Sequence, residues 1–348
     1  MRRRALLVAV GSAALAGCLD REPNGDSSGT APDDGSNGTD DSANPDDEPP
    51  LIASTDLAGE CPPYPDEYVV CYDAVVAHER DITDFEVVLE PDPETVERGE
   101  TIAFELANRS ETRFATNFYN WRLHKRVDGE WFDIAPQEYP EPLMSIDPGG
   151  THTWRLTVAE DAVADGEPVD RSGETGTEEL SVAALGGGQY AFRARGWFED
   201  GYEDGTYAFG ATFDVDAPTL SITPTNAIVD TRREDDTLVA ESDRGDPEDG
   251  QFAAYELRRV GEAGSNGEFP ADEDVTRLIT EQVLRNNQLR DAIALTIEYD
   301  VDTVRIEEHT GVTPVFGSNS DGYYEIDGTL YEVTTEAIDG ATIDLSSR

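Results

Sequence analysis

The amino-acid sequence predicts a mainly β fold, in which an antiparallel β-sandwich is followed by a small α+β domain. Three observations lead to this prediction. From Cys61 to about Asp216, apolar and polar residues alternate with a period of two between turn signals, which is typical of strands with one buried face. Beyond Pro270 the apolar period changes to about 3.6 residues, as in an amphipathic helix. Residues 19 to 55 contain hardly any apolar side chains, so they cannot form a core.

The first eighteen residues have the pattern of an export signal. A basic start precedes an apolar run from Ala5 to Gly17, and this run is shorter than the roughly 20 residues that a transmembrane helix needs. The run ends in a tetrad that resembles the lipobox of lipoprotein signal peptides, which implies that its last residue carries lipid. The tetrad is Leu15, Ala16, Gly17 and Cys18. Arg3 and Arg4, followed by two leucines, are similar to a twin-arginine signal, which implies export of an already folded chain.

Acidic residues dominate the composition. The 348 residues include 75 Asp or Glu and 25 Lys or Arg, for a formal net charge of −50, and Lys125 is the only lysine. Such a charge destabilises a compact fold in dilute buffer, whereas molar salt shortens the screening length to about 3 Å. This Arg-rich, Lys-poor and acidic profile resembles that of secreted proteins of halophilic archaea, which implies a place on the outer surface of the cell. Nucleic acid is disfavoured as a partner, because phosphate binding requires a basic face.

Changes in composition divide the chain into five segments. We predict a lipoprotein signal peptide over 1–17, a disordered acidic linker over 18–55, the β-sandwich over 56–216, a connector over 217–250 and the α+β domain over 251–348. Repulsion between its like charges is expected to keep the linker extended. The linker would then hold the folded domains away from the membrane.

Two cysteines and two sequons are candidate sites of covalent modification. Cys61 and Cys71 are an even pair in an exported chain, which predicts a disulfide. Metal binding is the lesser alternative, since neither a C-x-x-C spacing nor a nearby histidine pair accompanies them. Asn37 and Asn108 begin glycosylation sequons, and their occupancy is left open because such short motifs often arise by chance.

Turn signals separate about seven strands in the predicted sandwich. Asp128-Gly129 predicts a two-residue hairpin, and Leu185-x-x-Gly188-x-Tyr190 resembles the tyrosine corner of Greek-key proteins, which implies a hydrogen bond from the phenol to nearby backbone. The turn spacing over residues 85 to 216 resembles the bacterial immunoglobulin-like (Ig-like) domains of cell-surface proteins. The turns that carry this resemblance are Arg98-Gly99-Glu100, Asn108-Arg109-Ser110, Asp128 to Trp131 and Asp147-Pro148-Gly149. The resemblance implies a spacer or a binding module and no particular chemistry, and the inter-sheet cysteine pair of antibody domains is missing.

The C-terminal part combines helical and strand patterns. One helical face is shared by Val275, Leu278, Ile279 and Val283, and the helix is expected to break at Asn286 before a second one. Asp327-Gly328 predicts a hairpin between two aromatic strands. This hairpin is similar to one in the C-terminal domains of uncharacterised halophile lipoproteins, a family that has no known activity to transfer.

No motif in the sequence names a reaction. The histidines are His78, His124, His152 and His309, without metal-binding spacing, and we predict that His124 and His152 are surface residues of strands. Carboxylates are so frequent that no pair can be singled out as a general acid and base. No catalytic residue, metal site or cofactor is therefore predicted. Phe118, Phe132 and Phe198 fall out of phase with the core and are candidates for an exposed patch at a partner site.

The sequence favours a lipid-anchored, non-enzymatic protein on the extracellular face of the cell membrane, with a binding or envelope-structural role. Its expected partners are the membrane, through the lipid on Cys18, and a protein or glycan at the cell surface. One alternative is an extracellular hydrolase, which a cleft with a histidine, a carboxylate and a hydroxyl would support. Another is a protease-inhibitor-like module, which an exposed aromatic loop would support.

Overall fold

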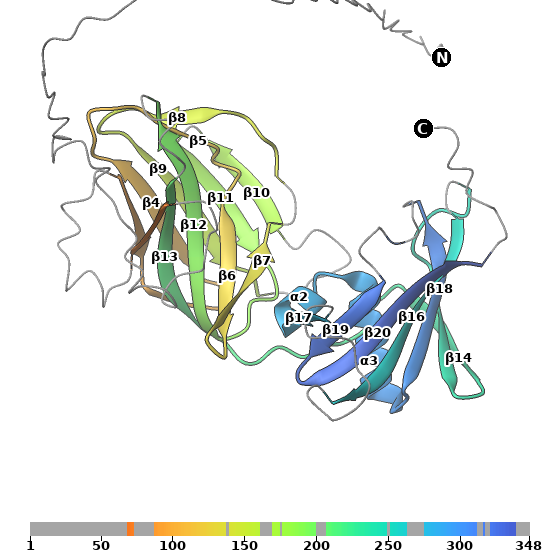
Figure 1. The fold of residues 1–348 in the computed structure, drawn as a ribbon. Coiled ribbons are helices and arrows are strands. Elements are labelled where there is room, and N and C mark those ends of the chain that lie inside the picture. Colours follow the sequence, from red (N-terminus) through yellow and green to blue (C-terminus); the bar gives the residue numbers. More distant parts are fainter. Residues whose placement is uncertain are drawn as a thin grey trace, which may run out of the picture. The chain divides into compact units, whose positions relative to one another are not determined.

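The computed structural model describes residues 68–72, 87–136, 139–160, 169–174, 176–199, 207–248, 251–262, 275–311, 316 and 321–338. All of them belong to one unit of the chain, residues 49–348. In this part of the chain, strands far outnumber helices (Figure 1). The prediction of a mainly β fold is confirmed.

Two sheets form the first folded part. One contains β1 (Tyr68–Tyr72), β3 (Thr95–Glu97), β5 (Phe114–Thr116), β6 (Arg122–Val127), β7 (Glu130–Ala135), β8 (Met144–Ile146), β12 (Gly188–Phe198) and β13 (Tyr207–Asp216). The other contains β2 (Val87–Asp92), β4 (Thr101–Asn108), β9 (Thr151–Val158), β10 (Val169–Glu174) and β11 (Thr177–Val182). Most neighbouring strands are antiparallel, but β1 and β3 run parallel to β13, and β11 runs parallel to β9.

An aromatic core fills the space between these two sheets. Strand β4 buries alternate residues, including Ile102, Phe104 and Leu106. Phe104 stacks on Phe192 of β12, in the other sheet, with the ring centroids 4.2 Å apart. The ring of Trp154 on β9 lies 5.5 Å from that of Phe192. Side chains from both sheets thus share one core, as in a β-sandwich.

The second folded part is a seven-stranded mixed sheet with a helix packed against it. Its strands, in spatial order, are β14 (Ile228–Glu234), β15 (Thr237–Ser242), β18 (Thr303–Thr310), β16 (Gln251–Glu262), β20 (Thr329–Ala337), β19 (Gly322–Ile326) and β17 (Val275–Leu278). The helices are α2 (Thr280–Val283) and α3 (Asn287–Tyr299). Leu289 and Ile293 of α3 share a core with Leu257 of β16 and Ile306 of β18.

The structure corrects two predictions for this second part. Residues 228–242 were expected to belong to a connector, but they form the hairpin β14–β15 at the edge of the sheet, because Leu238 and Ala240 contribute to its core. The first predicted helix begins only at Thr280. Residues 275–278 instead form β17, which pairs with β19, so strand pairing overrides the helical pattern there.

The predicted turns have the geometry that their sequences require. Asp128 and Gly129 both have positive φ, at 52° and 87°, and join β6 to β7. Asp327 and Gly328, at 48° and 75°, join β19 to β20. These are the conformations of a two-residue hairpin turn. The predicted helix break is also confirmed, since the Asn286 side chain accepts a hydrogen bond from the Leu289 N–H at the start of α3.

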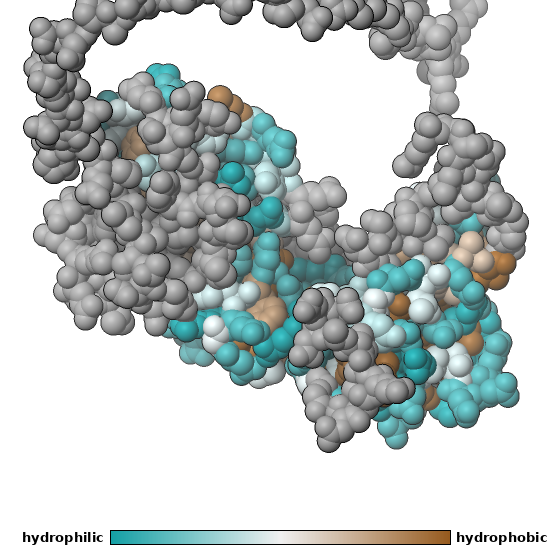
Figure 2. Space-filling model, viewed as in Figure 1, coloured by the Kyte–Doolittle hydropathy of each residue, from teal (hydrophilic) through white to brown (hydrophobic). Residues whose placement is uncertain are grey.

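On the face shown in Figure 2, hydrophilic side chains cover most of the surface of the described residues, and apolar residues are scattered among them. None of the helices that the structure describes is both long enough and apolar enough to cross a membrane.

Candidate functional site

A buried cluster of polar and charged groups joins the sandwich to α2. We call it the clamp, and it consists of Lys125, Gly186, Tyr190, Glu281 and Arg285. Glu281 of α2 is only 3% exposed. Its Oε1 accepts hydrogen bonds from Lys125 Nζ at 2.5 Å and from the Gly186 N–H at 3.2 Å. The single lysine of the chain therefore neutralises a buried carboxylate.

The predicted tyrosine corner is part of the clamp. The Tyr190 hydroxyl donates a hydrogen bond to the Gly186 carbonyl at 2.7 Å and lies 3.4 Å from Glu281 Oε1, so this prediction is confirmed. Burial, and then the neighbouring Glu281 carboxylate, raise the pKa of Tyr190 well above its ordinary value. The phenol therefore stays protonated and remains a hydrogen-bond donor.

The glycine run before β12 allows α2 and the following segment to approach closely. A Cβ on Gly186 would lie 2.9 Å from Glu281 Oε1, and one on Gly187 would lie 2.3 Å from the Ala217 carbonyl oxygen. Any side chain at these positions would displace the clamp or the backbone. The run is thus a close-packed turn.

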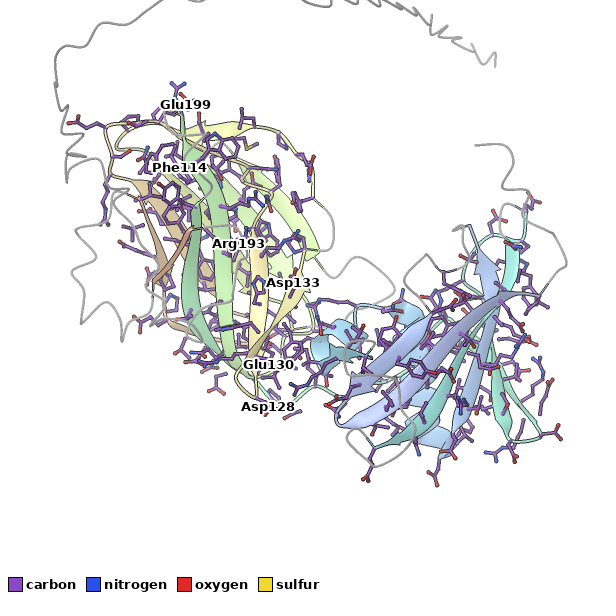
Figure 3. All side chains as sticks on the ribbon, in the orientation of Figure 1. Phe114, Asp128, Glu130, Asp133, Arg193 and Glu199 are labelled. Atoms are coloured by element: carbon purple, nitrogen blue, oxygen red, sulfur yellow. The ribbon has the colours of Figure 1, made fainter. Side chains whose placement is uncertain are left out.

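Arg285 completes the clamp through backbone carbonyls. Its Nη1 donates to the Glu281 carbonyl at 2.6 Å, and its Nη2 donates to the Ala183 carbonyl at 2.7 Å. Burial lowers the pKa of Arg285 to about 10, so the guanidinium remains charged at neutral pH. At the exposed rim, Arg277 of β17 pairs with Asp128 and Glu130 of the β6–β7 hairpin, two residues that Figure 3 labels.

A cavity of about 260 Å³ lies beside the clamp. The two share a boundary, because Leu220 lines the cavity and its Cγ lies 3.1 Å from where a Cβ on Gly186 would be. The residues that line the cavity are Arg98, Ala159, Glu160, Ala184, Thr219, Leu220, Ser221, Thr223, Leu284 and Arg290. They come from the sandwich, from the segment after β13 and from the helical region. Two guanidinium groups and one carboxylate of the described residues therefore lie around a small space.

The first turn of α3 fixes one wall of this cavity. Arg290 Nε donates to the Thr223 carbonyl at 2.8 Å. The next residue, Asp291, is fully buried and accepts hydrogen bonds from the N–H of Thr225 and, at 2.9 Å, from its hydroxyl. Arg244 Nη1 also donates to Asp291, at 2.7 Å, and Arg244 Nε donates to Glu308 at 2.8 Å. The segment that carries Thr219, Ser221 and Thr223 is thus tied to α3.

The outer face of β6, β7 and β12 carries a cluster of charged residues. His124 lies opposite Asp133 across β6 and β7, and Arg193 lies opposite Arg122 across β12 and β6; Figure 3 labels Asp133 and Arg193. Burial, and then the charges of Arg193 and Arg122, lower the pKa of His124 to about 3. Burial raises the pKa of Asp133, although both arginines oppose that shift. His124 is therefore neutral at physiological pH.

The predictions for the histidines and the out-of-phase aromatic residues were wrong. His124 and His152 are buried, at 9% and 2% exposure. Phe132 is also buried, and Phe118 and Phe198 pack against the sandwich core. His152 and Phe198 are in phase with the core residues of their own strands: His152 with Trp154 on β9, and Phe198 with Phe192 on β12. The predictions assigned both residues to the wrong face.

His152 is held by aromatic contacts. Its ring stacks on Phe118 with centroids 3.5 Å apart and meets Trp154 edge-on at 4.5 Å. Neither ring nitrogen has a hydrogen-bond partner in the described part of the chain. Burial lowers the pKa of His152 to about 4 from an ordinary value of 6.5. The fold therefore requires the neutral imidazole.

This burial predicts a loss of stability on acidification. Between pH 6.5 and about 4 the unfolded chain binds a proton at His152 that the folded chain does not bind, so the free energy of unfolding falls as pH falls, by at most about 1.4 kcal/mol per pH unit. Urea unfolding at constant high salt should show a shallower decline between pH 6.5 and 5 for His152→Gln than for the wild type. Equal slopes would contradict the assignment.

The modification sites predicted from the sequence fall mostly outside the described residues. This applies to Arg3, Arg4, Leu15, Ala16, Gly17, Cys18, Asn37 and Cys61. The backbone of Cys71 pairs with Gly210 in β1–β13, and the disulfide stays a prediction. Asn108, however, is 1% exposed, and its Nδ2 donates to the carbonyls of Thr112 and Ile146. A glycan on Asn108 is therefore incompatible with the folded protein, and that sequon is instead a hydrogen-bonded turn.

Sequence reasoning missed the clamp and the cavity, although one signal pointed to the clamp. A single lysine among 75 acidic residues indicates a position where arginine is not equivalent. Its partner Glu281 is 156 residues away in the chain, which no local pattern reveals. No group of three or more His, Cys, Asp or Glu side chains among the described residues is arranged to hold a metal ion.

No protein-family model and no curated protein matches this chain. A solved structure of an alkylpurine DNA glycosylase from Pseudomonas fluorescens, bound to DNA with an abasic site analogue, is similar over 38% of this chain, with 12% sequence identity and a TM-score of 0.20. The match spans 31% of that glycosylase, less than a third of its length. A likeness of this size carries no inference about fold or function.

Proposed function

We propose that this chain is a lipid-anchored protein of the extracellular cell surface of a halophile, and that it binds a ligand or partner without catalysing a reaction. The observation that carries the proposal is the tetrad Leu15 to Cys18 at the end of a basic and apolar leader. Acylation of Cys18 would hold the protein at the membrane, with about 0.8 kcal/mol contributed by each buried methylene and stable anchoring from two lipid signals.

The charge distribution supports an environment of high salt. Arg305 pairs with Glu307 and Glu336 at 3.1 and 2.6 Å, and Arg232 pairs with Glu234, Glu241 and Glu307 at 2.8 to 2.9 Å. Each of these arginines thus forms ion pairs with more than one carboxylate. The remaining carboxylates repel one another, and this repulsion is weakened by molar salt.

Two features favour binding over the alternatives. His124 and His152 are buried, with pKa values lowered to about 3 and 4, so neither is tuned to act as a general base near neutral pH. The aromatic residues that would form an inhibitor-like loop pack against the core instead. The cavity beside the clamp offers a place for a small ligand.

The anchor is tested by cell fractionation of the full-length protein in a halophilic archaeal host. The wild type is expected in the membrane fraction and to be extractable with detergent. Cys18→Ala is expected in the soluble fraction or the medium, because the proposed anchoring group is then lost. Ser12→Ala, in the same leader, is the matched control and should leave the location unchanged. Retention of Cys18→Ala in the membrane to the wild-type extent would overturn the proposal.

A further inference from the structure

The cavity beside the clamp has an unusual charge for this molecule. Among the described residues, Arg98 and Arg290 line it together with one carboxylate, that of Glu160, so these lining residues carry one net positive charge in a chain of net charge −50. Arg290 is 5% exposed and is positioned through its bond to the Thr223 carbonyl. Arg98 forms no hydrogen bond or ion pair with another residue in the part of the chain that the structure describes. Its guanidinium is therefore available to an anion.

The other residues that line the cavity provide hydroxyl groups and an apolar wall. Thr219, Ser221 and Thr223 are at alternate positions of the segment between β13 and β14 and supply hydroxyl groups. Leu220 and Leu284 supply an apolar wall and belong to a small hydrophobic cluster with Ala184. Guanidinium groups match the planar carboxylate geometry, hydroxyls both donate and accept hydrogen bonds, and leucine side chains suit the C–H face of a ring.

Size narrows the class of ligand further. The volume of about 260 Å³ lies just below the range of about 300 to 1,000 Å³ that is usual for drug-sized ligands. It corresponds to one ring with its substituents. A phosphate or other dianion fits less well, because Glu160 would repel the second charge.

We infer that this cavity binds a small hydroxylated carboxylate, of the chemical class of a hexuronic acid, with the carboxylate on Arg98 and Arg290 and the ring hydroxyls on the Thr219 to Thr223 segment. The inference names the ligand of the proposed binding role and rests on that role, but it does not require the lipid anchor. The ligand is either a free sugar acid or the acidic end unit of a glycan.

Isothermal titration calorimetry on the full-length protein in about 2 M KCl tests the inference with three monomers. Glucuronate is expected to bind saturably. Glucuronamide, which has the same ring without the charge, and glucose are expected to bind at least about tenfold more weakly, because a hydrogen bond to a charged group is lost. A uronate disaccharide distinguishes the two sources: tighter binding than glucuronate assigns a glycan end, and equal or weaker binding assigns the free acid.

Single substitutions test whether glucuronate binds in this cavity. Arg98→Gln is expected to weaken glucuronate binding about tenfold or more. Arg109→Gln is the matched control, because Arg109 is an exposed arginine that pairs with Glu90 outside the cavity, and it should bind like the wild type. If Arg98→Gln lowers the unfolding temperature, Ser221→Ala is the second variant, expected to weaken glucuronate binding at an unchanged unfolding temperature.

Absence of saturable glucuronate binding, equal binding of glucose, or wild-type affinity in both Arg98→Gln and Ser221→Ala would overturn the inference. The result is separable from that of the anchor experiment. A protein that stays in the membrane fraction and does not bind glucuronate removes only the ligand assignment. A protein that binds glucuronate but does not depend on Cys18 for its location removes only the anchor.

Discussion

Replacing Glu281 with alanine is expected to lower the free energy of unfolding by about 3 to 5 kcal/mol. The substitution leaves the ammonium of Lys125, a residue that is 9% exposed, without the carboxylate that it contacts, and it removes the acceptor of the Gly186 N–H. A buried charge that loses its partner keeps the full cost of its desolvation. Urea unfolding at constant high salt, followed by tryptophan fluorescence, is the measurement, because all four tryptophans belong to the predicted sandwich segment.

Glu130→Ala is the matched control for this prediction. Glu130 also forms an ion pair between the β6–β7 hairpin and β17, but its side chain is 62% exposed, so its loss should change stability by less than about 1 kcal/mol. The double variant Lys125→Met/Glu281→Leu should recover most of the stability, since it removes both charges together. Equal effects of Glu281→Ala and Glu130→Ala would show that burial of the pair is not the cause.

Asp291→Ala is expected to destabilise the second folded part by a similar amount, about 3 to 5 kcal/mol. Asp291 is fully buried, and its carboxylate accepts hydrogen bonds from the backbone and hydroxyl of Thr225 and from Arg244. Its loss leaves a buried N–H and part of a guanidinium unsatisfied. It also releases the segment that forms one wall of the cavity, so weaker glucuronate binding should accompany the loss of stability.

Asp302→Ala provides the comparison. Asp302 pairs with Arg259 at 3.4 Å and its side chain is 78% exposed, so its replacement should have an effect below about 1 kcal/mol. Far-UV circular dichroism should show a lower urea midpoint for Asp291→Ala, whereas tryptophan fluorescence, which reports on the sandwich, should change less. An unchanged dichroism midpoint would contradict the structural role assigned to Asp291.

Local sequence patterns predicted those features that depend on neighbouring residues. Hairpins at Asp128-Gly129 and Asp327-Gly328 follow from residues that tolerate positive φ, and the tyrosine corner at Tyr190 spans only four residues to Gly186. The helix break at Asn286 follows from side-chain capping. Each of these signals acts over a few residues, so a single sequence is enough to reveal it.

Patterns failed where a distant partner decided the outcome. The pattern of residues 275–278 predicts a helix, but they form β17 and pair with residues of β19 that lie 48 positions later in the chain. His152 was predicted to be exposed, but it lies on the face of β9 that carries Trp154, and Phe118 from another segment stacks on its ring. Asn108 matches a glycosylation sequon, but its side-chain amide donates a hydrogen bond to the Ile146 carbonyl, 38 residues away. Neither the hydrophobic periodicity nor a short sequence motif reveals contacts between residues so far apart in the chain.

By itself the sequence determined the mainly β class, the main turns, the strong acidity and the leader that predicts export and acylation, because composition and short-range stereochemistry fix all of these. Only the tertiary structure decided that Lys125 meets Glu281, that two histidines are buried and neutral, and that Arg98 and Arg290 face one cavity. These arrangements depend on contacts between residues far apart in the chain, where burial makes charge and hydrogen bonding most consequential.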